Sequence, residues 1–245
     1  MPLVDAHCHL EHPRFAGDAA AVVERAEAAG VGLAVTAGSN FSNNQKALEL
    51  CRLYPRFLKC VIGLSPHDAG SEELEKNIVL IRKNRDKIIG VGEIGLDYHH
   101  FKKKEGRERQ VKVFGAQLEL AAELRLPVVV HSREAEKEVF EVLEGFKGTV
   151  VMHCFIRPER AAECAKRGYF VSIPTTKCGE REEMIRAMPL ERLLCETDSP
   201  FLWRGRNEPA NVREAYGEVA HVKETDFNKV VEQIYSNARE AFRGL

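Results

Sequence analysis

Short apolar runs alternate with longer amphipathic segments along the chain, and this alternation limits the possible folds more than any other feature. Short apolar runs predict strands, and apolar residues at helical spacing predict helices. The predicted strands are Leu3–His7, Gly32–Ala37, Leu58–Gly63, Ile88–Glu93, Pro127–His131, Thr149–His153, Tyr169–Ser172 and Leu193–Glu196. The predicted helices are Asp18–Ala29, Ser42–Leu53, Glu72–Asn84, Glu108–Leu124, Glu134–Glu144, Pro158–Arg167, Glu180–Ala187, Val212–Lys223 and Phe227–Phe242. Ser71 is expected to cap the helix that begins at Glu72.

Eight strand-then-helix units predict an α/β protein with the (β/α)8 architecture of a TIM barrel. All-apolar strands such as Val128–Val130 indicate parallel strands that are buried on both faces. A doubly wound open sheet is the alternative for the same pattern. No long linker rich in Pro, Gly or Ser interrupts the sequence, so we expect residues 1–245 to form a single domain.

Residues with metal-binding side chains follow several of the predicted strands. A strand at Leu3–His7 would point His7 and His9 the same way, because side chains alternate along a strand. Four further residues of this kind stand at or just after strand ends: Glu93, His131, His153 and Asp198. A closed barrel brings those ends around one mouth, whereas an open sheet spreads them in a line, so their placement favours the barrel.

Four histidines and two carboxylates are more ligands than one cation needs if water must also bind. Two cations that share a bridging carboxylate would use all six, and such pairs, roughly 3.5–4 Å apart, suit in-line displacement at phosphorus. Nitrogen-rich ligation favours zinc, manganese, nickel or cobalt, while carboxylates and phosphate oxygens also accommodate magnesium. We therefore expect two divalent metal ions of open identity.

Composition limits how a charged partner could be bound. With 36 basic and 37 acidic residues, the chain has a formal net charge of −1, so it lacks a broad basic field for duplex DNA. No apolar stretch approaches the roughly 20 residues of a membrane span, and no secretory signal is visible. The seven cysteines lack CxxC spacing, which is typical of reduced thiols in a cytoplasmic protein.

Seven segments, in order along nearly the whole chain, give the sequence a resemblance to a known family. They are Val4–Leu10, Gly63–Asp68, Gly92–Asp97, His131–Arg133, His153–Phe155, Glu196–Phe201 and Arg206–Pro209. In these segments the chain resembles the TatD family of metal-dependent deoxyribonucleases, within the amidohydrolase superfamily. The runs Gly-Glu-Ile-Gly-Leu-Asp and Glu-Thr-Asp are the most diagnostic.

The resemblance implies a role for each of the six metal-binding residues. The implied ligands are His7, His9 and Asp198 for one ion, His131 and His153 for the other, and Glu93 as a bridge between them. Metal binding lowers the pKa of a bound water, so that hydroxide exists near neutral pH and can attack the phosphodiester. Glu93 and Asp198 are therefore expected to be catalytic, and Asp198 could also orient the nucleophile or take its proton.

Substrate contacts are expected from three further residues. His67 follows the third predicted strand and could contact the scissile phosphate or, as a catalytic residue, protonate the leaving oxygen. Arg133 could neutralise a phosphate through its guanidinium, and Arg206 in the last matching segment is also expected to bind substrate. The family usually has Ser-Gly where this chain has Ile156-Arg157, which alters the loop over the mouth.

Other polar residues near these strand ends keep two interpretations. Asp5 is expected to have a structural or supporting hydrogen-bond role rather than to bind metal. Asp97 could assist at the site or cap a turn, and Glu196 could support a metal ligand or line the core. His99 and His100 lie beside a lysine run that could touch phosphates or be solvated.

These features predict an enzyme: a divalent-metal-dependent deoxyribonuclease that cleaves single-stranded DNA or DNA ends, in exo or endo mode. Trp203 could stack on a base or pack against the rim. The alternative is a D-aminoacyl-tRNA deacylase or another ester or amide hydrolase on the same metals. A metal-bound scaffold without catalysis is a third hypothesis, which the intact ligand set disfavours. We expect a monomer with no membrane partner, and stronger activity with manganese or cobalt than with magnesium.

Overall fold

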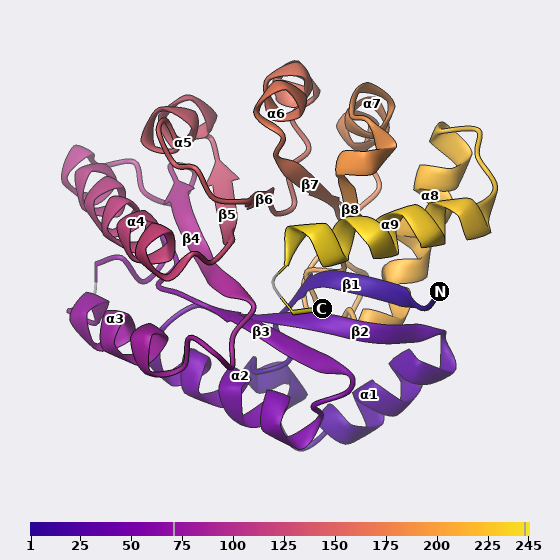
Figure 1. Ribbon diagram of the computed structural model, residues 1–245, viewed down its shortest axis with the longest axis horizontal. Coiled ribbons are helices and arrows are strands. Elements are labelled where there is room, and N and C mark those ends of the chain that lie inside the picture. The colour runs from indigo at the N-terminus through magenta and orange to yellow at the C-terminus, as the bar shows by residue number, and fades with distance from the viewer. Residues whose placement is uncertain (71, 243) are drawn as a thin grey trace.

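Parallel strands that follow one another in chain order surround the centre of the molecule (Figure 1). The computed structural model describes residues 1–70, 72–242 and 244–245. Its strands are β1 (Leu3–Cys8), β2 (Val31–Gly38), β3 (Leu58–Ile62), β4 (Gly90–Asp97), β5 (Val128–Arg133), β6 (Val150–Met152), β7 (Phe170–Ile173) and β8 (Leu193–Cys195). Because the sheet order is β1 to β8 without a reversal, the predicted (β/α)8 barrel is confirmed and the doubly wound alternative is wrong.

Helices cover the outside of the strands (Figure 1). They are α1 (Ala19–Ala28), α2 (Phe41–Leu53), α3 (Leu74–Lys83), α4 (Lys104–Leu124), α5 (Glu136–Val142), α6 (Ala161–Arg167), α7 (Gly179–Ala187), α8 (Val212–Val222) and α9 (Phe227–Ala241). Helix α4 begins at Lys104 rather than at the predicted Glu108. A 3-10 turn at Pro158–Arg160 precedes α6, and Pro158 takes a first-turn position where its missing N–H costs nothing. Ser71 lies outside the described residues, so its capping role stays a prediction.

Strand β4 is longer than predicted and passes through Glu93 instead of ending there. Its pairing register with β5 shifts between Val91 and Ile94, and such irregularities re-aim a side chain. A Cβ on Gly92 would lie 2.7 Å from the Val129 side chain, and one on Gly95 would lie 2.1 Å from the His131 carbonyl oxygen. The two glycines therefore let β4 approach β5 closely on both sides of Glu93.

Backbone hydrogen bonds close the barrel at the carboxyl ends of β1 and β8. The Asp198 N–H donates to the His7 carbonyl at 2.9 Å, and the His9 N–H donates to the Ser199 carbonyl at 2.7 Å. Cys8 and Ser199 form an isolated parallel bridge rather than part of a ladder. The two segments that carry His7, His9 and Asp198 are therefore tied directly to each other.

Buried side chains hold the rest of this seam between β1 and β8. The Asp5 carboxylate accepts hydrogen bonds from the backbone N–H and the hydroxyl of Thr197, at 2.9 and 2.6 Å. The Tyr216 hydroxyl of α8 accepts from the Val4 N–H at 2.9 Å and donates to the Val4 carbonyl at 3.1 Å. Asp5 therefore has the structural role expected for it.

The barrel interior is apolar below the strand ends. Residues from around the barrel meet there: Val4, Ala6, Val35, Ala37, Val61, Ile89, Val129, Val151, Phe170 and Leu194. Phe242, just after α9, belongs to the same cluster, so the end of α9 covers the amino ends of the strands. A larger apolar core fills the space between the strands and the outer helices. Side chains alternate along a strand, so residues two apart point the same way. His131 therefore points inward like Val129, and His153 points inward like Val151.

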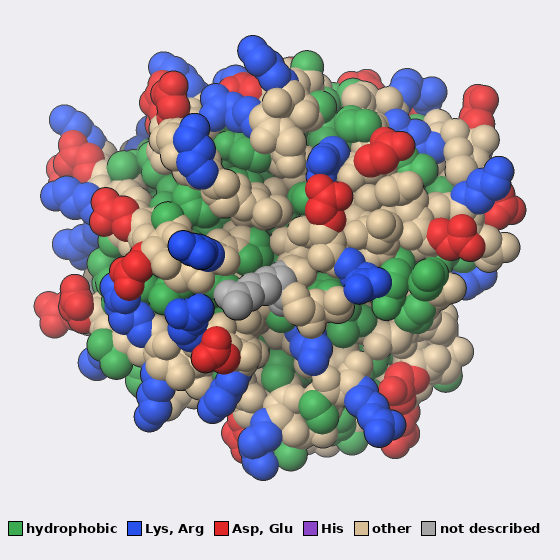
Figure 2. Space-filling model, in the orientation of Figure 1, with side chains coloured by type: hydrophobic (Ala, Val, Ile, Leu, Met, Phe, Trp, Pro, Cys, Tyr) green, Lys and Arg blue, Asp and Glu red, His purple; other side chains and the backbone are tan. Residues whose placement is uncertain are grey.

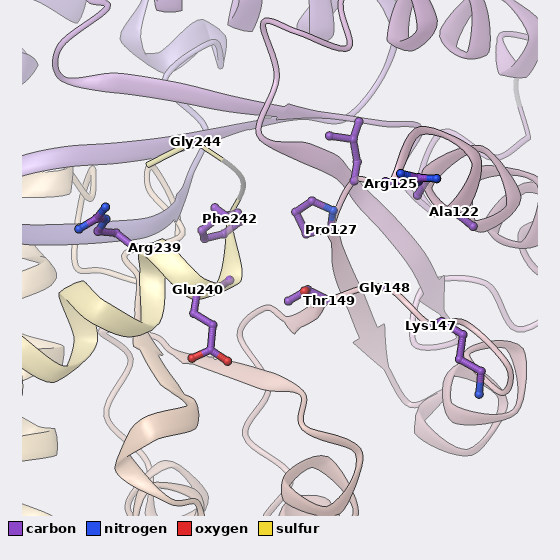
Figure 3. Close-up of a pocket in the computed structure, with 13 residues that line it drawn as sticks. Ala122, Arg125, Pro127, Lys147, Gly148, Thr149, Arg239, Glu240, Phe242 and Gly244 are labelled. Carbon is purple, nitrogen blue, oxygen red and sulfur yellow. The ribbon is translucent and has the colours of Figure 1, made fainter.

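The amino-terminal end of the barrel differs from the mouth. Lysines and arginines are interspersed there with acidic side chains on the face seen in Figure 2. A hollow lined by Pro127, Thr149 and Phe242 opens at this end, with Lys147 and Arg239 on opposite sides of it (Figure 3). Within the described part of the chain, no helix is long and apolar enough to cross a membrane.

Candidate metal centre

The first group of metal-binding side chains lies where the β1–β8 seam opens into the mouth. The Nε2 atoms of His7 and His9 are 3.2 Å apart. Asp198 Oδ1 is 3.7 Å from His7 Nε2 and 3.3 Å from His9 Nε2. All three side chains converge on one small volume that could hold a cation.

The second group is built on β4, β5 and the end of β6. Glu93 Oε1 is 2.9 Å from His131 Nδ1 and 3.3 Å from His153 Nε2. The two histidine nitrogens are 3.2 Å apart. These three ligand atoms also converge as a metal site requires.

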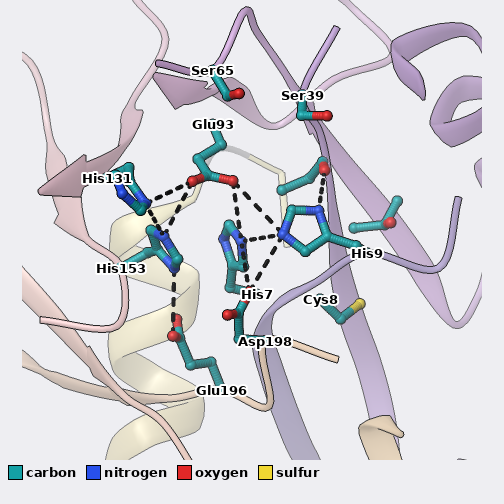
Figure 4. A network of polar contacts seen from close by, with 12 residues as sticks. His7, Cys8, His9, Ser39, Ser65, Glu93, His131, His153, Glu196 and Asp198 are labelled. Atoms are coloured by element: carbon teal, nitrogen blue, oxygen red, sulfur yellow. Dashed lines mark hydrogen bonds and ion pairs between the residues drawn. The ribbon is translucent and has the colours of Figure 1, made fainter. Parts of the chain in front are cut away.

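Glu93 stands between the two groups (Figure 4). While its Oε1 faces the second group, its Oε2 is 3.9 Å from His7 Nε2 and 3.7 Å from His9 Nε2. The rings of His7 and His153, one from each group, stack with centroids 4.0 Å apart. One carboxylate therefore presents an oxygen to each group, as a bridging ligand does.

Hydrogen bonds on the far sides of the rings fix which nitrogen faces the centre. His9 Nδ1 is 2.7 Å from the Ala37 carbonyl oxygen, which can only accept, so Nδ1 carries a hydrogen and Nε2 is the nitrogen that a cation would bind. His131 Nε2 is 3.2 Å from Asp97 Oδ2, so Nε2 carries the hydrogen and the lone pair of Nδ1 is available to a cation beside Glu93. This lone-pair arrangement fits a cation in each group.

Burial and neighbouring charges shift the protonation of these groups. Burial raises the pKa of Glu93, but His153 and His131 outweigh burial and hold that pKa well below its usual range. Burial and the neighbouring His153 lower the pKa of His7 well below its usual range. An ionised carboxylate and a neutral imidazole are the forms that bind metals.

A cavity of about 500 Å³ opens over the centre, and two of the three predicted substrate contacts line it. His67 and Arg133 both line it, together with His9, Glu93 and other residues of the two groups. The His67 side chain is 46% exposed, so it can reach a ligand in the cavity. The structure thus brings His67 and Arg133 to the mouth.

Arg206, the third predicted substrate contact, lies away from this cavity. Its guanidinium pairs with Asp18 and, at 2.7 Å, with Glu208, and it lies 5.0 Å from the centre of the Phe15 ring. Arg206 is not among the described residues that line the cavity. Its contacts tie the segment before α8 to the start of α1, in place of the expected substrate contact.

Three acidic residues support the ligands in ways that the sequence left open or did not indicate. Asp97, at the buried end of β4, is hydrogen-bonded to His131. Glu196 Oε1 lies 3.5 Å from His153 Nδ1, and its other oxygen accepts a hydrogen bond from the Ser172 hydroxyl. Glu11, which sequence reasoning missed, is 3.2 Å from His9 Nδ1. Its place two residues after His9 is the only signal that could have indicated it.

Comparisons with known proteins agree with this geometry. The sequence profile described as TatD-related DNase matches residues 4–243. An uncharacterized metal-dependent hydrolase of Methanocaldococcus jannaschii is 36% identical over 98% of this chain and 96% of its own length. A protein of Erwinia tasmaniensis named 3′-5′ ssDNA/RNA exonuclease TatD is 33% identical, over 98% of this chain and 99% of its own.

Among solved structures, a TatD homologue from Escherichia coli superposes with a TM-score of 0.89 at 26% identity, covering 99% of this chain and 98% of the other. The match therefore includes every strand of the barrel. By profile, sequence and fold alike, the chain belongs to the TatD-related DNase family.

Proposed function

We propose that this chain hydrolyses phosphodiester bonds in DNA, with two divalent cations bound at the mouth of the barrel. The observation that carries the proposal is the Glu93 carboxylate, which presents one oxygen to His7 and His9 and the other to His131 and His153. Two cations bound in this way would supply a hydroxide near neutral pH and polarise the phosphate. The nuclease names of the family and of the Erwinia relative support DNA as the substrate.

Asp198 and His67 have the best positions for moving protons. The Asp198 side chain is 14% exposed against 7% for Glu93, so it is the more accessible of the two carboxylates to an attacking water. We assign to Asp198 the orientation of that water and the acceptance of its proton. His67, on the cavity wall, would contact the phosphate or protonate the leaving oxygen. His67→Ala should lower turnover without loss of the two ions, and unchanged turnover would remove this role.

Arg133 and an apolar rim would hold the nucleic acid. Arg133 is exposed beside the cavity, where its guanidinium could pair with a phosphate. Phe201, Leu202 and Trp203 are consecutive large apolar residues that are 42%, 36% and 39% exposed, and the first two line the cavity. An aromatic rim and a formal net charge of −1 favour single strands or ends over duplex DNA. Trp203→Ala should raise KM for single-stranded DNA, and an unchanged KM would exclude stacking.

Metal identity follows from the donor set. Four imidazole nitrogens favour manganese, cobalt, zinc or nickel, and the carboxylates still admit magnesium. We propose higher activity with manganese or cobalt than with magnesium, to be compared by titration of each ion. Since one chain supplies the whole centre, we also propose that residues 1–245 act as a single domain and as a monomer, which sedimentation can check. A cytoplasmic location stays a prediction.

The decisive experiment is hydrolysis of a 5′-labelled single-stranded DNA by metal-stripped protein that is resupplied with magnesium, manganese or zinc. Glu93→Ala should abolish cleavage, whereas Glu119→Gln, an exposed glutamate of α4, should not. The ladder of products separates exonucleolytic from endonucleolytic cutting. No cleavage with any ion, in protein shown to bind metal, would refute the proposal and return attention to ester or amide substrates. No feature of the site favours those substrates now.

A further inference from the structure

A third group of metal-binding side chains lies beside the candidate centre, at the end of β4 and in the loops that follow β3 and β4. Asp97 Oδ2 is 3.0 Å from His67 Nε2 and 2.9 Å from His100 Nδ1. The two histidine nitrogens are 3.4 Å apart. We call these three residues the rim triad. None of them is among the six residues assigned to the two ions.

The Asp97 carboxylate has more partners than hydrogen bonds alone explain. Its Oδ1 accepts from the His100 backbone N–H at 2.8 Å. Its Oδ2 is approached by His67, His100 and also His131, whose Nε2 is 3.2 Å away. A carboxylate oxygen has about two lone-pair positions, so three imidazoles cannot all be good donors to it. If the His131 N–H occupies one lone-pair position of Oδ2, a cation bound at the other position could coordinate His67 and His100 as well.

The spacing of the rim triad matches that of the two groups at the centre. Its three ligand atoms are separated by 2.9, 3.0 and 3.4 Å, and the histidine pairs of the centre by 3.2 Å. Ligand atoms about 2.0–2.1 Å from a zinc ion at tetrahedral angles lie about 3.3 Å apart. The rim triad is therefore as compact as a zinc site and leaves one side open.

We propose that His67, Asp97 and His100 bind a third divalent cation, of the zinc or cobalt type rather than magnesium. Two imidazoles and one carboxylate suit these borderline ions, and magnesium prefers an all-oxygen shell. The site is accessible, since the His67 and His100 side chains are 46% and 50% exposed. Its accessible histidines, and a carboxylate oxygen that it shares with His131, make this the weakest and most exchangeable of the three sites.

The open side of the rim triad faces the substrate cavity. His67, His100 and Arg133 all line that cavity. A cation here would add a positive charge beside Arg133, and it would contact a substrate phosphate in place of the bare His67 imidazole. The rim site goes beyond the proposed hydrolysis and does not depend on it, because it requires only metal binding.

Metal counting on the full chain, without DNA, tests the rim site. Metal-stripped protein is dialysed against rising zinc concentrations, and the bound ions per chain are measured by elemental analysis. We expect one ion fewer in His100→Ala than in wild type, with the tighter ions unchanged. His99→Ala is the matched control, since it removes an exposed neighbouring histidine that is paired with Glu134 outside the rim triad. When both proteins are titrated with cobalt, His100→Ala should reach a lower visible absorption than wild type, because one cobalt site is missing.

A second variant guards against an indirect effect of His100→Ala. His67→Gln removes the other imidazole of the rim triad but leaves Asp97 and its hydrogen bond to His131 in place, so it should also lose the weakest ion while the tighter ions stay bound. Equal zinc content in wild type and His100→Ala would overturn the proposal. An equal loss in His99→Ala would overturn it too, because it would mark binding to scattered surface histidines. Occupancy by magnesium at concentrations where zinc fills the site would contradict the assigned metal class.

Discussion

The two halves of the candidate centre rest on different kinds of support. His131 and Glu93 stand on β5 and β4, which pair through a parallel ladder, and His153 directly follows β6. His7 and His9 stand on and just after β1, at a seam that has an isolated bridge and a few side-chain hydrogen bonds instead of a ladder. The second group is thus held mainly by backbone ladders, with a register shift at Glu93, and the first by two backbone hydrogen bonds and individual buried side-chain contacts.

The difference shows where stability and function are coupled. A backbone ladder uses no side-chain atoms, so apart from the close contacts at Gly92 and Gly95 the second half depends less on particular side chains. The seam depends on Asp5, Thr197 and Tyr216, which lie outside the metal groups and yet position His7 and Asp198. A cation shared through Glu93 would also join the two halves, and it would therefore stabilise the seam more than the ladder.

Metal removal should have the largest effect and would expose that asymmetry. A chelator should abolish hydrolysis and lower the melting temperature, since ions at 100 times their Kd contribute about 2.7 kcal/mol. Amide hydrogen exchange should increase more in β1 and β8 than in β4 and β5, because local opening follows the weaker pairing. Readdition of manganese should reverse both changes. An equal increase in exchange over all four strands would contradict the claim that the β1–β8 seam is held more weakly than the β4–β5 pair.

Substitution of the supporting acids should separate the halves. Asp5→Asn should weaken the ion at His7, His9 and Asp198 by about 10–100-fold, since supporting hydrogen bonds tune metal affinity by that factor. Glu196→Gln removes a carboxylate charge 3.5 Å from His153 Nδ1 and should weaken the ion at His153. Anomalous diffraction from crystals soaked in rising manganese concentrations gives the occupancy of each site. If each variant emptied both sites together, the two halves would not be independent.

The sequence predicted the repeating architecture and the residues that converge at the mouth, because both depend on local patterns. Strand alternation places His131 and His153 inward whatever the distant contacts are. The end of β4 was harder to predict, since Gly92 and Gly95 look like strand breakers. In the structure, a Cβ on either glycine would collide with β5, so both mark close contacts between the two strands.

Long-range partners explain where the structure places a residue differently from the expectation, or where its role stayed undecided. Arg206 looked available for a phosphate, but Asp18, far away in sequence, pairs with it. Asp97 could not be assigned because His67 and His131 reach it from other strands. No local pattern contains that information, since such contacts exist only once the barrel has closed.

A smaller effect is expected from Tyr216→Phe, which removes both hydrogen bonds to Val4 but keeps the buried ring. Leaving the Val4 backbone groups buried without their partner should lower the free energy of unfolding by about 1–3 kcal/mol. Denaturant unfolding of wild type and variant measures the difference. Tyr235→Phe, on the neighbouring helix α9, is the control and should change stability less. A stability equal to wild type would show that the backbone bonds of the seam suffice without the tyrosine.

Proton release on metal binding is the smallest expected effect. It compares the protonation of His7 with that of His9 and His153. Burial lowers the pKa of His9, but Asp198 and Glu11 together outweigh burial and raise that pKa well above its usual range. The pKa of His153 is likewise raised, mainly by Glu93 against burial, whereas that of His7 is lowered. At neutral pH the metal-free protein should therefore hold protons on His9 and His153 but not on His7, and a cation must displace them. Calorimetric titration with manganese in buffers of different ionisation enthalpy should show net proton release that decreases as pH rises. His9→Ala should release fewer protons than wild type, and binding enthalpies that do not depend on the buffer would contradict the assignment.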